Sequence, residues 1–113
     1  MYYLEIISLE GCPYSIAAEE LVKTKKIKHE IIKINHDDKQ LHKNNKIDTF
    51  PQIYLRKDNS TGRLLVGGYQ NLDKINIMID GNSNVTNLVK EIKKIISDDF
   101  NKKSILRMIE LIK

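Results

Sequence analysis

An apolar run at the start of the chain, and the break that follows it, set the frame of the fold. Residues 2–8 are mostly β-branched or aromatic with a single charge, which is typical of a central strand covered on both faces. Gly11 ends this run. Pro13 suits the first turn of a helix, where the missing N–H of proline leaves no hydrogen bond unmade. The sequence therefore predicts a buried strand, then a helix that begins at Cys12 and reaches Thr24.

Short apolar segments and helical segments continue to alternate after this helix. Residues 29–35 form a second Ile-rich strand candidate, and cap-type residues predict a brief helix over 37–45. A third strand is expected over 49–55. A dense turn cluster at 57–62 then leads into a fourth strand at 63–66, so this pair reads as a hairpin.

The C-terminal part of the chain is predicted to be helical. Residues 70–79 fit both a strand and a helix, and we favour a helix because a strand here would have no neighbour to pair with. Gly81 ends this segment. Asn84 can cap a helix over 85–97 with a wide apolar stripe, and a last amphipathic helix is expected over 102–112. The element order predicts an α/β fold.

Composition bounds the class of protein. The chain has 113 residues, which fits one domain spanning 1–113, and it is 41% hydrophobic and 30% charged, as in ordinary globular proteins. Apolar runs fall short of the roughly 18 residues of a membrane span, and the N-terminus lacks the features of a secretory signal, so we expect a cytoplasmic protein without membrane contact. The net charge is +4, but the lysines are dispersed, which argues against nucleic-acid binding. A redox-silent module for an acidic partner stays open as an alternative.

The single cysteine is the candidate nucleophile. One cysteine makes neither an internal disulfide nor a Cys-rich zinc site, so Cys12 is either a small buried hydrophobe or a reactive group. We favour reactivity, because a helix N-terminus stabilises a thiolate and depresses its pKa. Ser15, one turn later, stands where a second thiol would resolve a mixed disulfide, so exchange must be completed by an external thiol. No metal site is expected. The three histidines, His29, His36 and His42, are not paired at i, i+4, and no Cys or carboxylate stands near them at the spacing of metal ligands.

Two further segments suggest a ligand groove. A cis Phe50–Pro51 bond would turn the backbone polar groups of Phe50 toward an extended, peptide-like ligand, although the residues alone favour the commoner trans form. Gly67 and Gly68 precede a helix N-terminus at Tyr69, which is a suitable place for a carboxylate.

Together these residues resemble the glutaredoxin family over about residues 1 to 80. Cys12–Ser15 resembles its C-P-Y-C site with the second cysteine replaced by serine. Thr49–Pro51 resembles its T-V-P segment, and Gly67–Leu72 its G-G-x-D-D-L segment. The resemblance implies a thioredoxin fold, with a four-stranded mixed sheet flanked by helices and further helices at the C-terminus. It also implies a cis proline at Pro51 and glutathione as the partner thiol.

The resemblance assigns roles by position. Cys12 becomes the catalytic residue, and Pro13 and Ser15 complete its motif. The residues implied in glutathione binding are Tyr14, Lys39, Thr49, Phe50, Pro51, Gly68, Tyr69 and Gln70. Leu9 stands where the family often has a lysine for the glycyl carboxylate, and Lys39 or Lys46 is expected to substitute. The paired acids of the family are replaced by Gln70 and Asn71, which removes a counter-charge for the ammonium group of glutathione.

The function implied is glutathione-dependent thiol–disulfide exchange by a monothiol mechanism. The expected partners are glutathione and glutathionylated proteins, and we expect a monomer. An alternative of another class is a carrier or sensor in which two protomers bridge a [2Fe-2S] cluster through Cys12 and glutathione. Pro13 and Tyr14 weigh against that alternative, because they are larger than the residues found at these positions in the better cluster binders.

Overall fold

A four-stranded sheet forms the centre of the computed structural model, which describes residues 1–81 and 84–113. Its strands are β1 (Tyr2–Leu9), β2 (His29–Ile34), β3 (Gln52–Lys57) and β4 (Arg63–Gly67). They lie in the order β2-β1-β3-β4; β1 pairs with β2 in parallel, whereas β1 with β3 and β3 with β4 are antiparallel. The sheet is therefore mixed, and the apolar N-terminal run occupies an inner position, as the sequence predicts.

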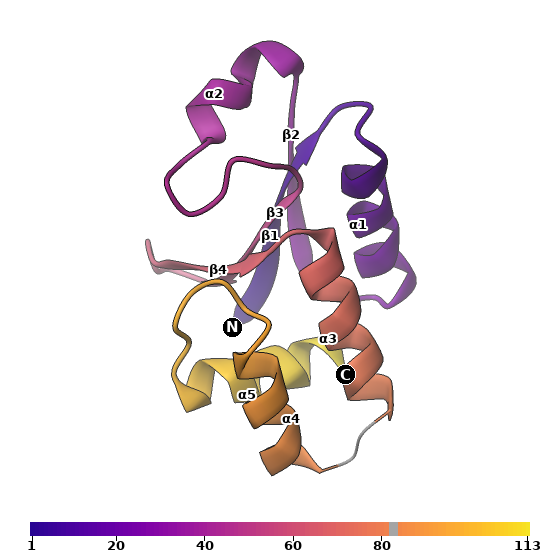
Figure 1. Ribbon diagram of the computed structural model, residues 1–113, viewed down its shortest axis with the longest axis vertical. Coiled ribbons are helices and arrows are strands. Elements are labelled where there is room, and N and C mark those ends of the chain that lie inside the picture. The colour runs from indigo at the N-terminus through magenta and orange to yellow at the C-terminus, as the bar shows by residue number, and fades with distance from the viewer. Residues whose placement is uncertain (82–83) are drawn as a thin grey trace.

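Five α-helices and one 3-10 turn accompany the sheet (Figure 1) within the described residues. The helices are α1 (Pro13–Thr24), α2 (Lys39–His42), α3 (Tyr69–Gly81), α4 (Val85–Lys93) and α5 (Lys102–Ile112); the 3-10 turn η1 covers His36–Asp38. The segment with the ambiguous pattern is helical. Three asparagines accept hydrogen bonds from backbone N–H groups at element starts, which explains where these elements begin: Asn35, Asn84 and Asn101. None of the described helices is long and apolar enough to cross a membrane.

The predicted helix over 37–45 is wrong in its length. The chain forms only η1 and the short α2, and then turns. The side chain of Asn44 accepts hydrogen bonds from the backbone N–H groups of Lys46 and Ile47, at 2.9 and 3.1 Å. Asparagine competes with the helix in this way by bonding to nearby backbone groups, and the turn follows from it.

Two other boundaries also differ from the sequence prediction. The third strand begins at Gln52 instead of residue 49, directly after Pro51, which has no N–H to donate to a ladder. The helix predicted over 85–97 ends at Lys93. Beyond it, the backbone N–H groups of Ser97 and Asp98 donate to carbonyl groups on the outer edge of β4. This pairing with a distant strand replaces the last helical turn.

The main core lies on one face of the sheet. Helices α1 and α3 run beside each other on this face, and α5 packs against β1. The largest fully buried side chains of this core include Leu4, Ile6, Ile53, Leu55, Leu72, Ile75, Ile92, Phe100, Ile105 and Met108. Residues from α4 and α5 belong to the same cluster as those from the sheet. The C-terminal helices are therefore part of the core that supports the sheet.

The opposite face of the sheet is divided into an apolar end and a polar end. The apolar cluster consists of Ile7, Leu9, Ile34, Tyr54 and Leu65, with Cys12, Ile32, Ile47 and Phe50 packed against it. Cys12 thus lies at the apolar end.

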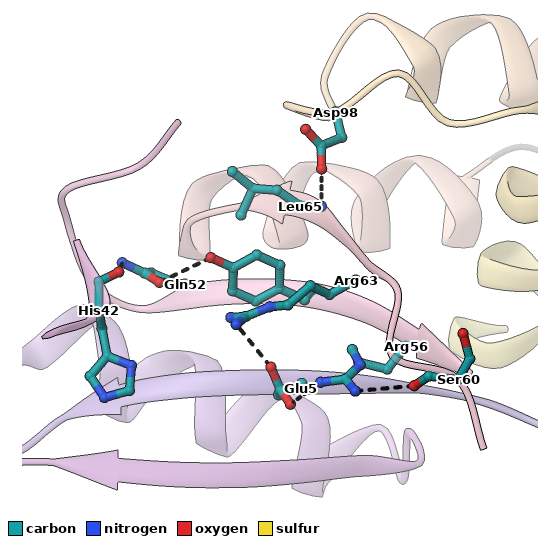
Figure 2. Close-up of polar contacts among 9 residues, drawn as sticks. Glu5, His42, Gln52, Arg56, Ser60, Arg63, Leu65 and Asp98 are labelled. Atoms are coloured by element: carbon teal, nitrogen blue, oxygen red, sulfur yellow. Dashed lines mark hydrogen bonds and ion pairs between the residues drawn. The ribbon is translucent and has the colours of Figure 1, made fainter. Parts of the chain in front are cut away.

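Glu5 is the centre of the polar end (Figure 2). Its buried carboxylate pairs with Arg56 at 2.8 Å and with Arg63 at 3.5 Å, and the guanidinium of Arg63 stacks 3.8 Å from the ring centre of Tyr54. The hydroxyl of Tyr54 donates to Gln52 at 3.1 Å. The side chain of Gln52 then donates to the carbonyl of His42 at 2.8 Å, which fixes the end of α2 over the sheet.

Candidate active site

Cys12 occupies the junction between β1 and α1. Gly11 has a φ of +73°, a left-handed conformation that glycine adopts without strain and that turns the chain at the end of the strand. Cys12 is the N-cap residue of α1, with Pro13 in the first turn, and its carbonyl accepts from the N–H of Ile16 at 3.0 Å. The half-buried thiol therefore lies at the positive end of the helix, as the sequence predicts.

The surroundings of Cys12 favour its thiolate form. Partial burial acts to raise the pKa of the Cys12 thiol, but hydrogen bonds from the backbone and the hydroxyl of Ser15 lower it. The backbone of Tyr14 and the positive charge of Lys39 lower it further, so the pKa lies below the ordinary thiol value. A thiolate is the nucleophilic form of cysteine, and a low pKa makes more of it available at neutral pH.

Ser15 is fully buried beneath the cysteine. Its hydroxyl accepts a hydrogen bond from the backbone N–H of Leu9 at 3.1 Å and also bonds to Cys12. The sequence places the hydroxyl and the sulfur on one face of the helix, and the structure agrees. Ser15 therefore makes two contacts, one to the thiol of Cys12 and one to the backbone of Leu9. The contact with Leu9 supports the fold, and the motif alone does not reveal it.

The segment before β3 lies against the sulfur. The Phe50–Pro51 peptide bond is cis, as the resemblance implies and contrary to the expectation from the residues alone. The carbonyl oxygen of Phe50 lies 3.8 Å from the Sγ atom of Cys12, within reach of its S–H. Two motifs that are 38 positions apart in the sequence are thereby brought together.

A cavity of about 390 Å³ opens beside this segment. Its lining comes from four parts of the chain: Tyr14, Lys46, Ile47, Thr49, Phe50, Pro51, Gly67, Gly68, Tyr69, Gln70, Asn71 and Ser97. The rings of Tyr14 and Tyr69 are 6.3 Å apart between their centres and inclined at 33°. A volume of a few hundred Å³ is typical of sites for small organic ligands. We call this cavity the groove.

The turn before α3 depends on close packing between Gly67 and Asn71. Gly67 has a φ of +136°, and a Cβ placed on it would lie 2.5 Å from the side chain of Asn71. That side chain accepts from the N–H of Gly68 at 3.2 Å and donates to the carbonyl of Ile95 at 2.8 Å. Asn71, at one of the positions where the family carries acids, therefore holds the turn and connects it to the segment after α4.

The two lysines expected near the ligand have different positions. Lys39 acts on the Cys12 thiol through its charge but is outside the lining of the groove. Lys46 lines the groove, and its ammonium group pairs with Asp98 at 2.8 Å. Leu9 is buried in the apolar cluster on that face of the sheet.

Most of the residues that the sequence singles out for ligand binding line the groove, with Lys39 as the exception. Ser97 and Asp98 were missed, because they follow a helix near the C-terminus and carry no motif. The only local signal is the polar run that begins at Ser97 and interrupts the apolar stripe. Burial raises the pKa of the Asp98 carboxyl, but hydrogen bonds from the Leu65 N–H and from Lys46, with the charge of Lys46, hold it below its usual range.

In residues 1–81 and 84–113, no three side chains of His, Cys, Asp or Glu gather as they would around a metal ion. The ring of His29 is engaged by the backbone carbonyl of Ile27 at 2.7 Å.

Comparisons with known proteins identify the family to which this chain belongs. Residues 4–59 match the family model described as Glutaredoxin, a stretch that includes Cys12 and the cis Phe50–Pro51 bond. Among solved structures, the fold is similar to that of glutaredoxin 1 from Francisella tularensis, crystallised as a complex with cacodylate. The identity is 21%, the alignment covers 73% of this chain and 100% of that chain, and the TM-score is 0.50. A search of curated proteins found no match. The family match and the thioredoxin fold agree with the resemblance seen in the sequence, and the chain belongs to the glutaredoxins, which are thiol–disulfide oxidoreductases of the thioredoxin superfamily.

Proposed function

We propose that this protein reduces protein–glutathione mixed disulfides by a monothiol mechanism through Cys12. The observation that carries the proposal is the position of the sulfur, at the N-terminus of α1 and against the carbonyl of Phe50, which lines the groove. The chain has one cysteine, so a second internal thiol is not available for the exchange.

The first step transfers glutathione to the protein. The Cys12 thiolate attacks the glutathione sulfur of the mixed disulfide, a new disulfide forms on Cys12, and the substrate protein leaves as a thiolate that takes a proton from solvent. The second step regenerates the enzyme. A glutathione thiolate attacks the glutathione sulfur of the adduct, glutathione disulfide departs, and Cys12 is again a thiolate.

The low pKa of Cys12 serves both steps. A lowered pKa increases the fraction of Cys12 present as its thiolate at a given pH, and it also makes Cys12 a better leaving group when the adduct is cleaved. The hydrogen bonds from Ser15 supply part of this effect. The serine therefore supports the reaction without taking part in electron transfer.

The groove is the proposed binding site for glutathione. Phe50 and Pro51 would offer backbone polar groups to the cysteinyl part of the tripeptide, with Thr49 beside them. The turn of Gly68, Tyr69 and Gln70 at the start of α3 would receive the γ-glutamyl carboxylate, because the first N–H groups of a helix have no partner within the helix. The N–H of Gly68 already donates to Asn71, so the donors for the ligand would come from Tyr69 and Gln70. Tyr14 would cover the ligand from the side of α1.

The test is a turnover assay coupled to glutathione reductase and NADPH, with a glutathionylated protein as substrate. The wild type is expected to turn over, and the Cys12→Ser variant is expected to fall to the rate of buffer. In parallel, mass spectrometry after exposure to glutathione disulfide should find a single adduct of ~305 Da on Cys12. A wild type that is no faster than Cys12→Ser, or that forms no adduct, would contradict the proposal.

A further inference from the structure

The segment between α4 and α5 forms one wall of the groove. The N–H groups of Ser97 and Asp98 donate to the carbonyls of Val66 and Leu65, at 3.2 and 3.0 Å, along the outer edge of β4. The carbonyl of Ile95 receives the side chain of Asn71, at the start of α3. Ser97 itself lines the cavity. The segment is thus fixed to two elements that build the site.

Asp98 is held in place by this pairing. Its carboxylate, which is only 13% exposed, accepts a hydrogen bond from the N–H of Leu65 at 2.7 Å (Figure 2). Its other oxygen accepts from Lys46 at 2.8 Å. One oxygen is therefore bound to the backbone of the sheet, and the second faces the loop that carries Lys46.

Lys46 is the one cationic side chain among the described residues that line the groove. Its side chain is 61% exposed, so its ammonium group is accessible to a ligand at the rim. A fixed carboxylate at 2.8 Å offsets this charge, and a carboxylate on an incoming ligand must share the lysine with Asp98 or displace it.

We propose that Asp98 is a positioning residue that acts through Lys46: it neutralises the lysine and so weakens the attraction of the groove for the carboxylates of glutathione. The inference rests on the proposed function, because it takes glutathione as the ligand. Asp98 acts through Lys46 and has no contact with the reacting sulfur, so its effect belongs to binding. We therefore expect a change in KM and not in kcat.

The decisive variant is Asp98→Asn. Asparagine keeps an oxygen for the N–H of Leu65 and removes the negative charge. We expect the KM for the mixed disulfide, and the Kd for the unreactive probe S-methylglutathione, to fall about threefold to fivefold at low ionic strength, as in the loss of one opposing charge near the surface. Added salt should reduce this gain.

Two matched variants make the test specific. Asp99→Asn removes the same charge from the next, exposed residue, and it is expected to leave KM within twofold of the wild type. In a protein that also carries Lys46→Met, the Asp98→Asn change should lower KM and Kd much less, because the lysine that Asp98 neutralises is no longer present. A gain that persists in the Lys46→Met background would overturn the proposal, since the carboxylate would then act on the ligand directly.

The wild type supplies a measurement that does not depend on whether the variants fold. If Lys46 is neutralised, the Kd of S-methylglutathione should rise only slightly as the salt concentration increases, whereas a steep rise would overturn the inference. An unchanged or higher KM in a folded Asp98→Asn variant would overturn it as well. A wild type with neither turnover nor binding would instead contradict the proposed function, and the inference with it.

Discussion

The hydroxyl of Ser15 accepts a hydrogen bond from the backbone N–H of Leu9 at 3.1 Å, which ties the first turn of α1 to the end of β1. The same hydroxyl bonds to the Cys12 thiolate. The stability of this junction and the acidity of the nucleophile therefore depend on one side chain.

The Ser15→Ala variant should lose both effects. The buried N–H of Leu9 would have no acceptor, which should lower the free energy of unfolding by about 1–3 kcal/mol, and the pKa of Cys12 should rise toward its ordinary value. Chemical denaturation and thiolate absorbance against pH measure the two. Ser104→Ala is the control, because Ser104 is the buried serine at the same position of α5, and it should leave the Cys12 pKa unchanged.

The pH dependence of alkylation reports the acidity of Cys12. The thiolate reacts, and a lowered pKa keeps the thiol deprotonated to lower pH, so the rate with iodoacetamide should reach half its maximum at a lower pH than for an ordinary cysteine. Lys39→Met should move this midpoint upward, because it removes a charge that favours the thiolate. Lys90→Met, an exposed change of the same charge on α4, should leave it in place. Equal midpoints in the wild type and Lys39→Met would contradict this electrostatic account.

Glu5→Gln should destabilise the fold without affecting the thiol. The change leaves the guanidinium of Arg56 without its buried partner and weakens the contact of Arg63 with the sheet. We expect the free energy of unfolding to fall by about 2–4 kcal/mol. This is a modest value for breaking a buried ion pair, because the side chain of Arg63 is 43% exposed. Glu30→Gln is the matched control, because Glu30 lies directly across from Glu5 in β2 and its side chain is exposed. A similar loss in both variants, seen by denaturation, would rule out the buried pair as the cause.

Gly67→Ala should disturb the turn into α3. Alanine is strained at a φ of +136°, and its Cβ would collide with the side chain of Asn71, which two hydrogen bonds hold in place. We expect a loss of about 1–3 kcal/mol in unfolding free energy. Gly81→Ala, at the end of the same helix, has open space around its Cβ and should change stability by less than about 1 kcal/mol, toward a gain. Equal thermal shifts in the two would show that the turn tolerates a side chain.

The sequence predicts several elements correctly where a local signal defines them. The break at Gly11, the proline after Cys12 and the cap residues at 35 and 84 lie next to the elements they define, and the structure has elements that begin there. The cis form of the Phe50–Pro51 bond was different. The residues alone favour trans, and only the resemblance pointed to cis.

The errors at Asn44 and Pro51 have local causes, whereas the other failures involve partners that are distant in the sequence. The helix predicted over 85–97 ends early because Ser97 and Asp98 pair with β4, about 30 residues upstream. The ion pair of Lys46 with Asp98 spans 52 positions, and no periodicity or motif connects the two. Such contacts depend on how the C-terminal helices pack against the sheet. The sequence shows the apolar stripes that drive this packing but not the register in which they meet.

The hydrogen bonds that Ser97 and Asp98 make to β4 have a consequence for solubility. An edge strand offers unpaired N–H and C=O groups on which another chain can add a strand and begin to aggregate. Along β4 these groups are already engaged at Leu65 and Val66. A version of the protein shortened before α4 would uncover that edge and part of the main core together, and we expect it to self-associate even if the cysteine stayed intact.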